Sequence, residues 1–96
     1  MSNALVSVQI IPKTPNGEDT IPYVDAAIEV IQQSGVKHVV QPLDTVMEGD
    51  LEQLLRIVQR MHEKMAALGA TSTIGQVKIF HKADGASMDV LTEKYR

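Results

Sequence analysis

Hydrophobic residues recur along the chain with alternating strand-like and helix-like periods. Between Ala4 and Ile11 every second residue is apolar, which is typical of a strand with one buried face, and Pro12 is expected to end that strand. The segment Ser2-Asn3-Ala4 is expected to contribute nothing to the fold. From Thr20 to Gly35 the apolar spacing becomes helical, with Thr20 as the expected N-cap and Gly35 as the C-terminal stop.

The second half of the chain repeats this alternation. Residues 36–43 and 45–48 predict two strands joined by a tight reversal. Asp50 is the expected N-cap of a long helix that ends at Gly69. Residues 72–81 predict a fourth strand, and Ser87 is expected to cap a short last helix.

The predicted order of elements is β-α-β-β-α-β-α. Two β-α-β halves in one antiparallel sheet, with both long helices on one face, give an α+β class protein: a ferredoxin-like sandwich with a short C-terminal helix, in one domain over residues 1–96. Replacing Leu55 with Ala is expected to cost about 2–5 kcal/mol. The predicted core consists of Val6, Val8, Ile10, Val24, Ile28, Ile31, Leu51, Leu55, Val58, Met65, Val77 and Ile79.

Composition and charge narrow the classes of function. Nine basic and twelve acidic side chains give a net charge of −3, which argues against a nucleic-acid partner. No apolar run is long enough for a membrane span, so no membrane partner is expected either. Cysteine is absent, which removes disulfides and zinc–thiolate sites. A cytoplasmic protein is expected.

Enzyme signatures are missing from the chain. No nucleotide-binding, metalloprotease or nucleophile-elbow motif occurs, and His38, His62 and His81 lack metal-ligand spacing. An acylphosphatase-like site would need an arginine after the first strand, but the first arginine is Arg56. An RNA-recognition module would need aromatic residues on its first and third strands, which have none. We therefore expect no catalytic residues, no metal and no cofactor.

The densest polar cluster runs from Gln41 to Asp50. Three carboxylates and one hydroxyl within ten residues can receive an amino group or a cation. Turn formation by Asp44-Thr45 and helix capping by Asp50 are the structural alternatives.

Four segments of the sequence resemble those of a known protein family. The segment P-L-D-T-V-M-E-G-D-L-E-Q-L-L, the strand V-S-V-Q-I-I-P, the helix Y-V-D-A-A-I-E-V-I-Q-Q-S-G and the late Met88-Asp89 resemble the small single-domain thiamine-binding proteins, which were long of unknown function. The similarity covers about residues 5–95. It implies a cytoplasmic homotetramer that binds thiamine or its hydroxymethylpyrimidine moiety without catalysis.

Four residues are the candidate ligand contacts. Gln9 is expected to face the side of the sheet that lacks helices, and Thr45 begins the neighbouring strand, so their side chains are expected to lie close together. Asp44 and Glu48 supply negative charge, and the nearest cations in sequence, Lys37 and Arg56, are seven or eight residues away. A second class of function remains open, namely an association or regulatory module whose uncovered sheet face only builds an oligomer. An uncharacterised enzyme would need an activated nucleophile that the sequence does not show.

Overall fold

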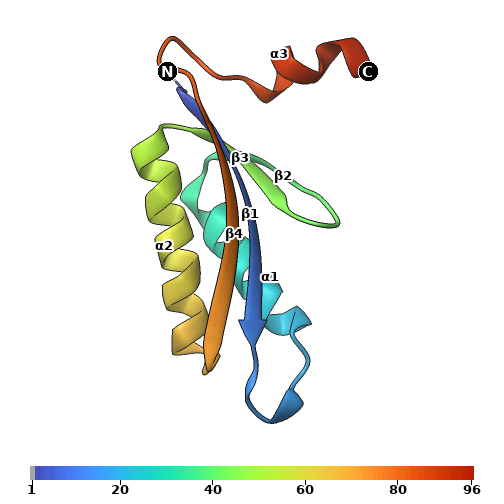
Figure 1. The fold of residues 1–96 in the computed structure, drawn as a ribbon, viewed down its shortest axis with the longest axis vertical. Helices are drawn as coiled ribbons and strands as arrows, with labels where there is room; N and C mark the ends of the chain where they lie inside the picture. Colours follow the sequence, from blue (N-terminus) through green and yellow to red (C-terminus); the bar gives the residue numbers. More distant parts are fainter. Residues whose placement is uncertain (1) are drawn as a thin grey trace.

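The computed structural model describes residues 2–96 and has the predicted order of elements. The strands are β1 (Ala4–Lys13), β2 (Lys37–Val40), β3 (Thr45–Gly49) and β4 (Ser72–His81). The helices are α1 (Ile21–Ser34), α2 (Leu51–Ala67) and α3 (Met88–Thr92), with single 3-10 turns at Pro15–Gly17 and Glu93–Tyr95. The sheet order is β2-β3-β1-β4 with every neighbouring pair antiparallel. Helices α1 and α2 pack together on one face (Figure 1), which confirms the ferredoxin-like sandwich.

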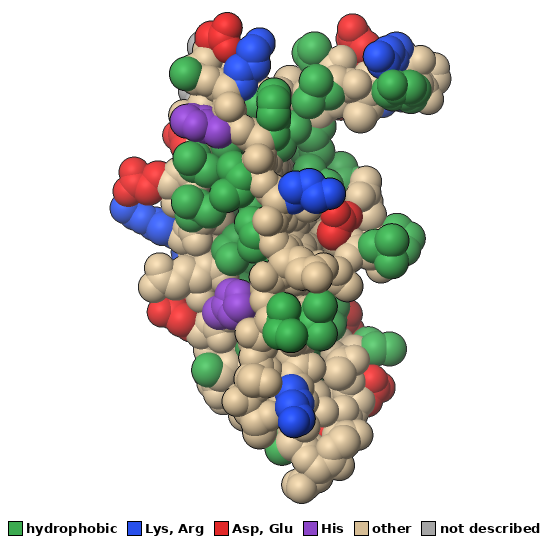
Figure 2. Space-filling view, in the orientation of Figure 1, with side chains coloured by type: hydrophobic (Ala, Val, Ile, Leu, Met, Phe, Trp, Pro, Cys, Tyr) green, Lys and Arg blue, Asp and Glu red, His purple; other side chains and the backbone are tan. Residues whose placement is uncertain are grey.

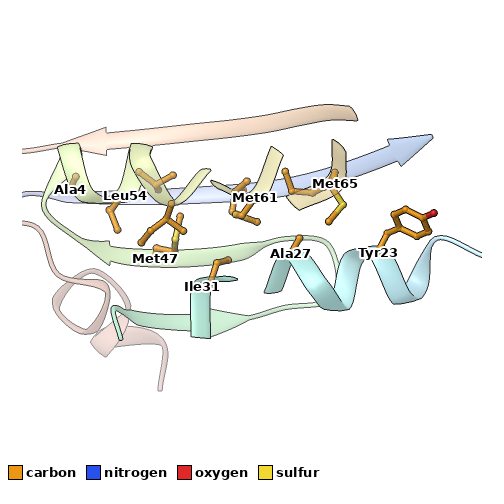
Figure 3. Close-up of a cluster of buried hydrophobic side chains, with 12 residues drawn as sticks. Ala4, Tyr23, Ala27, Ile31, Met47, Leu54, Met61 and Met65 are labelled. Carbon is orange, nitrogen blue, oxygen red and sulfur yellow. The ribbon is translucent and has the colours of Figure 1, made fainter. Parts of the chain in front are cut away.

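The core lies between this sheet and the two long helices. Even-numbered residues of β1 face the helices, and Val6, Val8 and Ile10 are buried as predicted. Figure 3 shows the methionines of β3 and α2 filling the layer between sheet and helices. The buried cluster comprises Ala4, Val6, Val8, Ile10, Tyr23, Ala27, Ile31, Met47, Leu54, Ile57, Met61 and Met65.

The prediction of burial is wrong for three residues of the predicted core. Leu55 is 41% exposed, Val77 39% and Ile79 48%, whereas Leu54 and Ile57 are fully buried. Val77 and Ile79 face the helix side, since they pair with Val8 and Val6, but β4 is the edge strand and the helices cover it only in part. Four others are only partly buried, namely Val24, Ile28, Leu51 and Val58.

The first strand continues through Pro12 to Lys13, where a stop at Pro12 was expected. The N–H of Lys82 donates to the carbonyl of Asn3, so odd-numbered residues of β1 direct their backbone groups toward β4. The nitrogen of Pro12 therefore points away from β4, toward a position that β3 does not reach. A proline is tolerated there because no ladder hydrogen bond is lost.

The residues that cap the N-termini of the two long helices are not those that the sequence predicts. Asn3 Oδ1 accepts the N–H of Leu51 at 3.0 Å, whereas Asp50 makes no side-chain cap. Asp19 Oδ1 accepts the N–H of Ile21 at 3.0 Å in place of the expected Thr20. The segment Ser2-Asn3-Ala4, expected to lie outside the fold, therefore starts β1 and caps α2.

Two predicted helix ends are confirmed. Gly35 ends α1 in the left-handed region with φ 79°, which glycine adopts without steric cost. Ser87 caps α3 by accepting the N–H of Val90 at 3.3 Å.

The side chain of Tyr23 joins the loop before α1 to the end of α2. The hydroxyl of Tyr23 donates to Glu18 Oε2 at 2.9 Å and lies 3.3 Å from the carbonyl oxygen of Leu68. The hydrogen bond to the Glu18 carboxylate, helped by desolvation, raises the pKa of Tyr23.

Helix α3 extends from one end of the sheet (Figure 1) and is tied to it by charge. Asp89 forms ion pairs with Lys37 of β2 and, at 2.7 Å, with Arg96. The hydrogen bond from Lys37, followed by that from Arg96, lowers the pKa of Asp89, and the same contact raises the pKa of Lys37.

Candidate functional site

A cavity opens beside β1 where β3 has not yet begun. It has a volume of about 210 Å³ and lies between β1, helix α1 and the β2–β3 turn. Its apolar wall includes Ile10, Ala27 and Met61, and its polar rim includes Gln41 and Asp44. A small planar ring with polar edges suits such a lining.

The backbone of Ile10 supplies hydrogen-bonding groups to this cavity. The alternation of the ladder directs the N–H and C=O of Ile10 away from β4, toward the β3 side. The pairing of β1 with β3 ends at Val8–Thr45, and within residues 2–96 no other backbone or side-chain group takes this place. One strand residue thus offers a donor and an acceptor side by side at the cavity wall.

A second cavity adjoins the first on the open face, by which we mean the sheet face without α1 and α2. It has a volume of about 340 Å³ and is lined by Ser7, Gln9, Leu43, Asp44, Gln76, Val77 and Lys78. Gln9, Leu43 and Asp44 line both cavities, so the two spaces meet at these residues.

Two of the four predicted contacts, Gln9 and Asp44, lie where the cavities meet. Gln9 pairs with Gln76 and is on the open face, as its position in the alternation indicates. Asp44 is half-buried in the β2–β3 turn, where its carbonyl accepts the N–H of Gln41 at 2.8 Å. Within residues 2–96 no lysine or arginine forms an ion pair with its carboxylate.

Thr45 is a neighbour of Gln9 along the sheet, but its side chain points the other way. It is opposite Val8 and only 5% exposed, on the helix side. Gln9 and Thr45 therefore both line the smaller cavity, although their side chains leave the sheet on opposite faces. Thr45 lines only the smaller of the two cavities, whereas Gln9 lines both.

Glu48 is placed away from both cavities. It is opposite Leu5, four residues along β1 from Gln9, which corresponds to about 13 Å. Its carboxylate accepts the N–H of Met88 at 2.8 Å and so holds the start of α3. Lys37 is the nearer of the two cations in space, because β2 pairs with β3 and brings Lys37 opposite Glu48, which the separation in sequence did not indicate.

Sequence reasoning missed the Ile10 backbone and the amide of Gln41. The contribution of Ile10 depends on the length of β3 rather than on its own side chain, so only the offset between a ten-residue and a five-residue strand could have indicated it. Gln41 belonged to the polar cluster but stood apart from its carboxylates in sequence.

The described residues were also searched for metal-binding clusters and membrane-spanning helices. Within the described residues 2–96, no group of three or more His, Cys, Asp or Glu side chains could hold a metal ion. His62 packs its ring against Gly75 at the boundary between α2 and β4. In the same part of the chain, no helix has the length and apolar character needed to cross a bilayer.

Comparison with known proteins gives one consistent family. The family model described as thiamine-binding protein matches residues 6–96. A UPF0045 protein of Clostridium perfringens is 42% identical over the full length of both chains.

Solved structures agree with this family in fold. A domain of unknown function, DUF77, from Bacillus cereus is 35% identical with a TM-score of 0.90, covering 99% of this chain and 92% of its own. A Thermotoga maritima protein assigned provisionally to thiamine biosynthesis or salvage is 28% identical with a TM-score of 0.85, covering 98% of this chain and 99% of its own. The chain described here belongs to the thiamine-binding protein family.

Proposed function

We propose that this protein binds thiamine or its hydroxymethylpyrimidine moiety, without catalysis, in the two adjoining cavities beside β1. The observation that carries the proposal is the free N–H and C=O of Ile10 at the wall of the smaller cavity. An aminopyrimidine presents an exocyclic amine donor next to a ring-nitrogen acceptor. This pair is complementary to one strand residue with an unpaired edge.

The charges around the larger cavity favour the rest of the thiamine molecule there. The Asp44 carboxylate can offset the positive charge of a thiazolium ring. Lys78 lines the same cavity and suits the hydroxyl or phosphate of the ring's side arm. Membership of a family named for thiamine binding agrees with both placements.

The proposed binder is a cytoplasmic homotetramer. Ile11, Ile74 and Phe80 lie exposed on the open face, and Val77 and Ile79 lie exposed on the helix side of the edge strand β4. Two such surfaces on one chain favour two kinds of contact between copies, which is a dimer of dimers. Light scattering at micromolar concentration should give a multiple of 10.5 kDa. A stable monomer would contradict the assembly.

Calorimetric titration tests the binding proposal. Hydroxymethylpyrimidine and thiamine should both bind the wild type. Asp44→Asn should weaken thiamine by about fivefold, since a charge pair near 4 Å in water is worth about 1 kcal/mol. The same variant should leave hydroxymethylpyrimidine, which is neutral, nearly unchanged.

Glu48→Gln is the matched control for this titration. It removes a carboxylate from the same strand region but not from either cavity, and its amide oxygen can still accept the Met88 N–H. Equal losses in both variants would contradict the placement of the ligand. An oligomeric wild type that binds no pyrimidine would favour the association module.

A further inference from the structure

Ser7 and Lys78 place a hydroxyl and an ammonium group side by side at one end of the open-face cavity. They pair across β1 and β4, and both line this cavity. Directly opposite side chains on neighbouring strands have Cβ atoms about 4.5–5.5 Å apart, so both donors can reach the same bound group. Gln76, the preceding residue of β4 on the same face, adds an amide. The three donors together suit an anion.

The charge of Lys78 is not neutralised within the described chain. In residues 2–96, Lys37 and Lys82 each form an ion pair with an aspartate, whereas Lys78 forms none. Figure 2 shows few charged side chains over the middle of β1 and β4. A lysine that lines a cavity and has no carboxylate partner is available to an anionic group of a ligand.

Asp44 gives the same cavity a second and opposite charge. It lies at the end where the two cavities meet and where Gln9 also lies, whereas Lys78 lies opposite Ser7. Gln9 and Ser7 are two residues apart on β1, which places the two ends about 7 Å apart along the strand. A ligand with a positive ring and a negative group on a short arm therefore matches the cavity better than a ligand with the positive ring alone.

We propose that the open-face cavity selects the phosphate monoester of thiamine over free thiamine, with Ser7 and Lys78 holding the phosphate. The inference rests on the proposed function and specifies which form of the ligand the site prefers. In this arrangement the thiazolium ring lies beside Asp44, and its two-carbon arm carries the phosphate to Lys78. Free thiamine ends in a neutral hydroxyl, which leaves the charge of Lys78 without a counter-charge.

The row of side chains beyond Lys78 does not suit a second phosphate. On the open face this row holds Leu5, with Phe80 on one side and Glu48 on the other. The two apolar side chains offer no donor, and the Glu48 carboxylate repels an anion. The next lysine along the chain, Lys82, is about 13 Å further and is already paired. A diphosphate should therefore gain nothing over the monophosphate.

Calorimetric titration of the whole chain with thiamine, thiamine monophosphate and thiamine diphosphate tests this selection. The titrations use one ionic strength and about pH 8, where the phosphate ester carries both of its negative charges. The monophosphate should bind about fivefold more tightly than thiamine, which is the factor expected for one added charge pair about 4 Å apart in water. The diphosphate should bind no more tightly than the monophosphate, and a tighter diphosphate would overturn the selection.

Two lysine variants separate the contact of Lys78 from the general charge of the chain. Lys78→Gln should reduce the ratio of the monophosphate and thiamine affinities from about five to about one. Lys82→Gln is the matched control, because it makes the same change of charge just beyond β4 and outside the cavity, so the ratio should stay at about five. Equal losses in both variants would overturn the role of Lys78.

Ser7→Ala tests the hydroxyl independently of the lysine. It removes one hydrogen bond to the phosphate, so it should lower the same ratio by about twofold. An unchanged ratio in this variant would overturn the part of the proposal that concerns Ser7.

Inorganic phosphate shows whether the anion is recognised as part of thiamine. It should give no measurable heat at concentrations at which the monophosphate saturates, because one charge pair in water is too weak to hold a small ion alone. Inorganic phosphate that binds as tightly as the monophosphate would overturn the selection. A wild type that binds thiamine and its monophosphate equally would leave the proposed function standing and overturn this inference alone. A wild type that binds neither would refute the proposed function.

Discussion

Two adjacent leucines of α2 should differ sharply in their contribution to stability. Leu54 is fully buried and its Cδ2 lies 3.2 Å from the ideal Cβ position at Gly49, whereas Leu55 is 41% exposed. Leu54→Ala leaves a cavity that cannot collapse onto this close contact, so it should cost about 2–5 kcal/mol. Leu55→Ala removes three carbons worth about 0.8 kcal/mol each when fully buried, and partial exposure reduces the loss to about 1 kcal/mol.

Urea denaturation of both variants at one protein concentration measures this difference. The transition midpoints are compared at constant slope, because a change in slope would indicate a change in the denatured state. A loss for Leu55→Ala equal to or greater than that for Leu54→Ala would refute the assignment of the buried face of α2. Such a result would instead support the predicted core, in which Leu55 is buried.

Two further predictions concern the chain ends. Asn3→Ala should destabilise the protein by about 1 kcal/mol in urea denaturation, and by more than Asp50→Ala, because Asn3 supplies the cap of α2; the reverse order would contradict it. The ion pairs of Asp89 lower its carboxyl pKa, so their contribution is present above the ordinary value of 3.8 and is lost as the pH falls through the lower folded value. Proteolysis at residues 88–96 should therefore be slow at pH 7 and fast in Asp89→Asn, and equal rates would contradict the tie to Lys37.

The order and type of the elements could be predicted from local pattern. Alternation along β1 and helical spacing along α2 each reflect which face is buried, and both long helices have strong periodicity. Gly35 and Ser87 act on their own helix ends, so their roles are visible in the sequence.

Features that depend on distant segments could not be predicted. Val77 and Ile79 alternate as a buried strand does, but an edge position leaves them half exposed. The cap of α2 comes from Asn3, 48 residues away, and Pro12 is accommodated only because β3 is short. Propensity and spacing describe the local chain, whereas these contacts are set by the pairing of strands.

The residues of the candidate site likewise include some that the sequence indicates and others that depend on the pairing of distant strands. Gln9 and Asp44 were found because a polar residue on an alternating strand and a carboxylate in a turn are visible in the sequence. Glu48 was misplaced because β3 carries it toward α3. The Ile10 backbone was missed since every residue has the same amide, and only topology leaves this one unpaired.

The most direct test of the account is an amide nitrogen–proton NMR titration of the protein with hydroxymethylpyrimidine. The account predicts that the Ile10 N–H shifts strongly and saturably, because it donates to the ring nitrogen of the ligand. The Val6 N–H, which lies within the paired part of β1, should stay nearly unchanged. Saturable shifts elsewhere with Ile10 unmoved, or no saturable shift at any amide, would contradict the central claim.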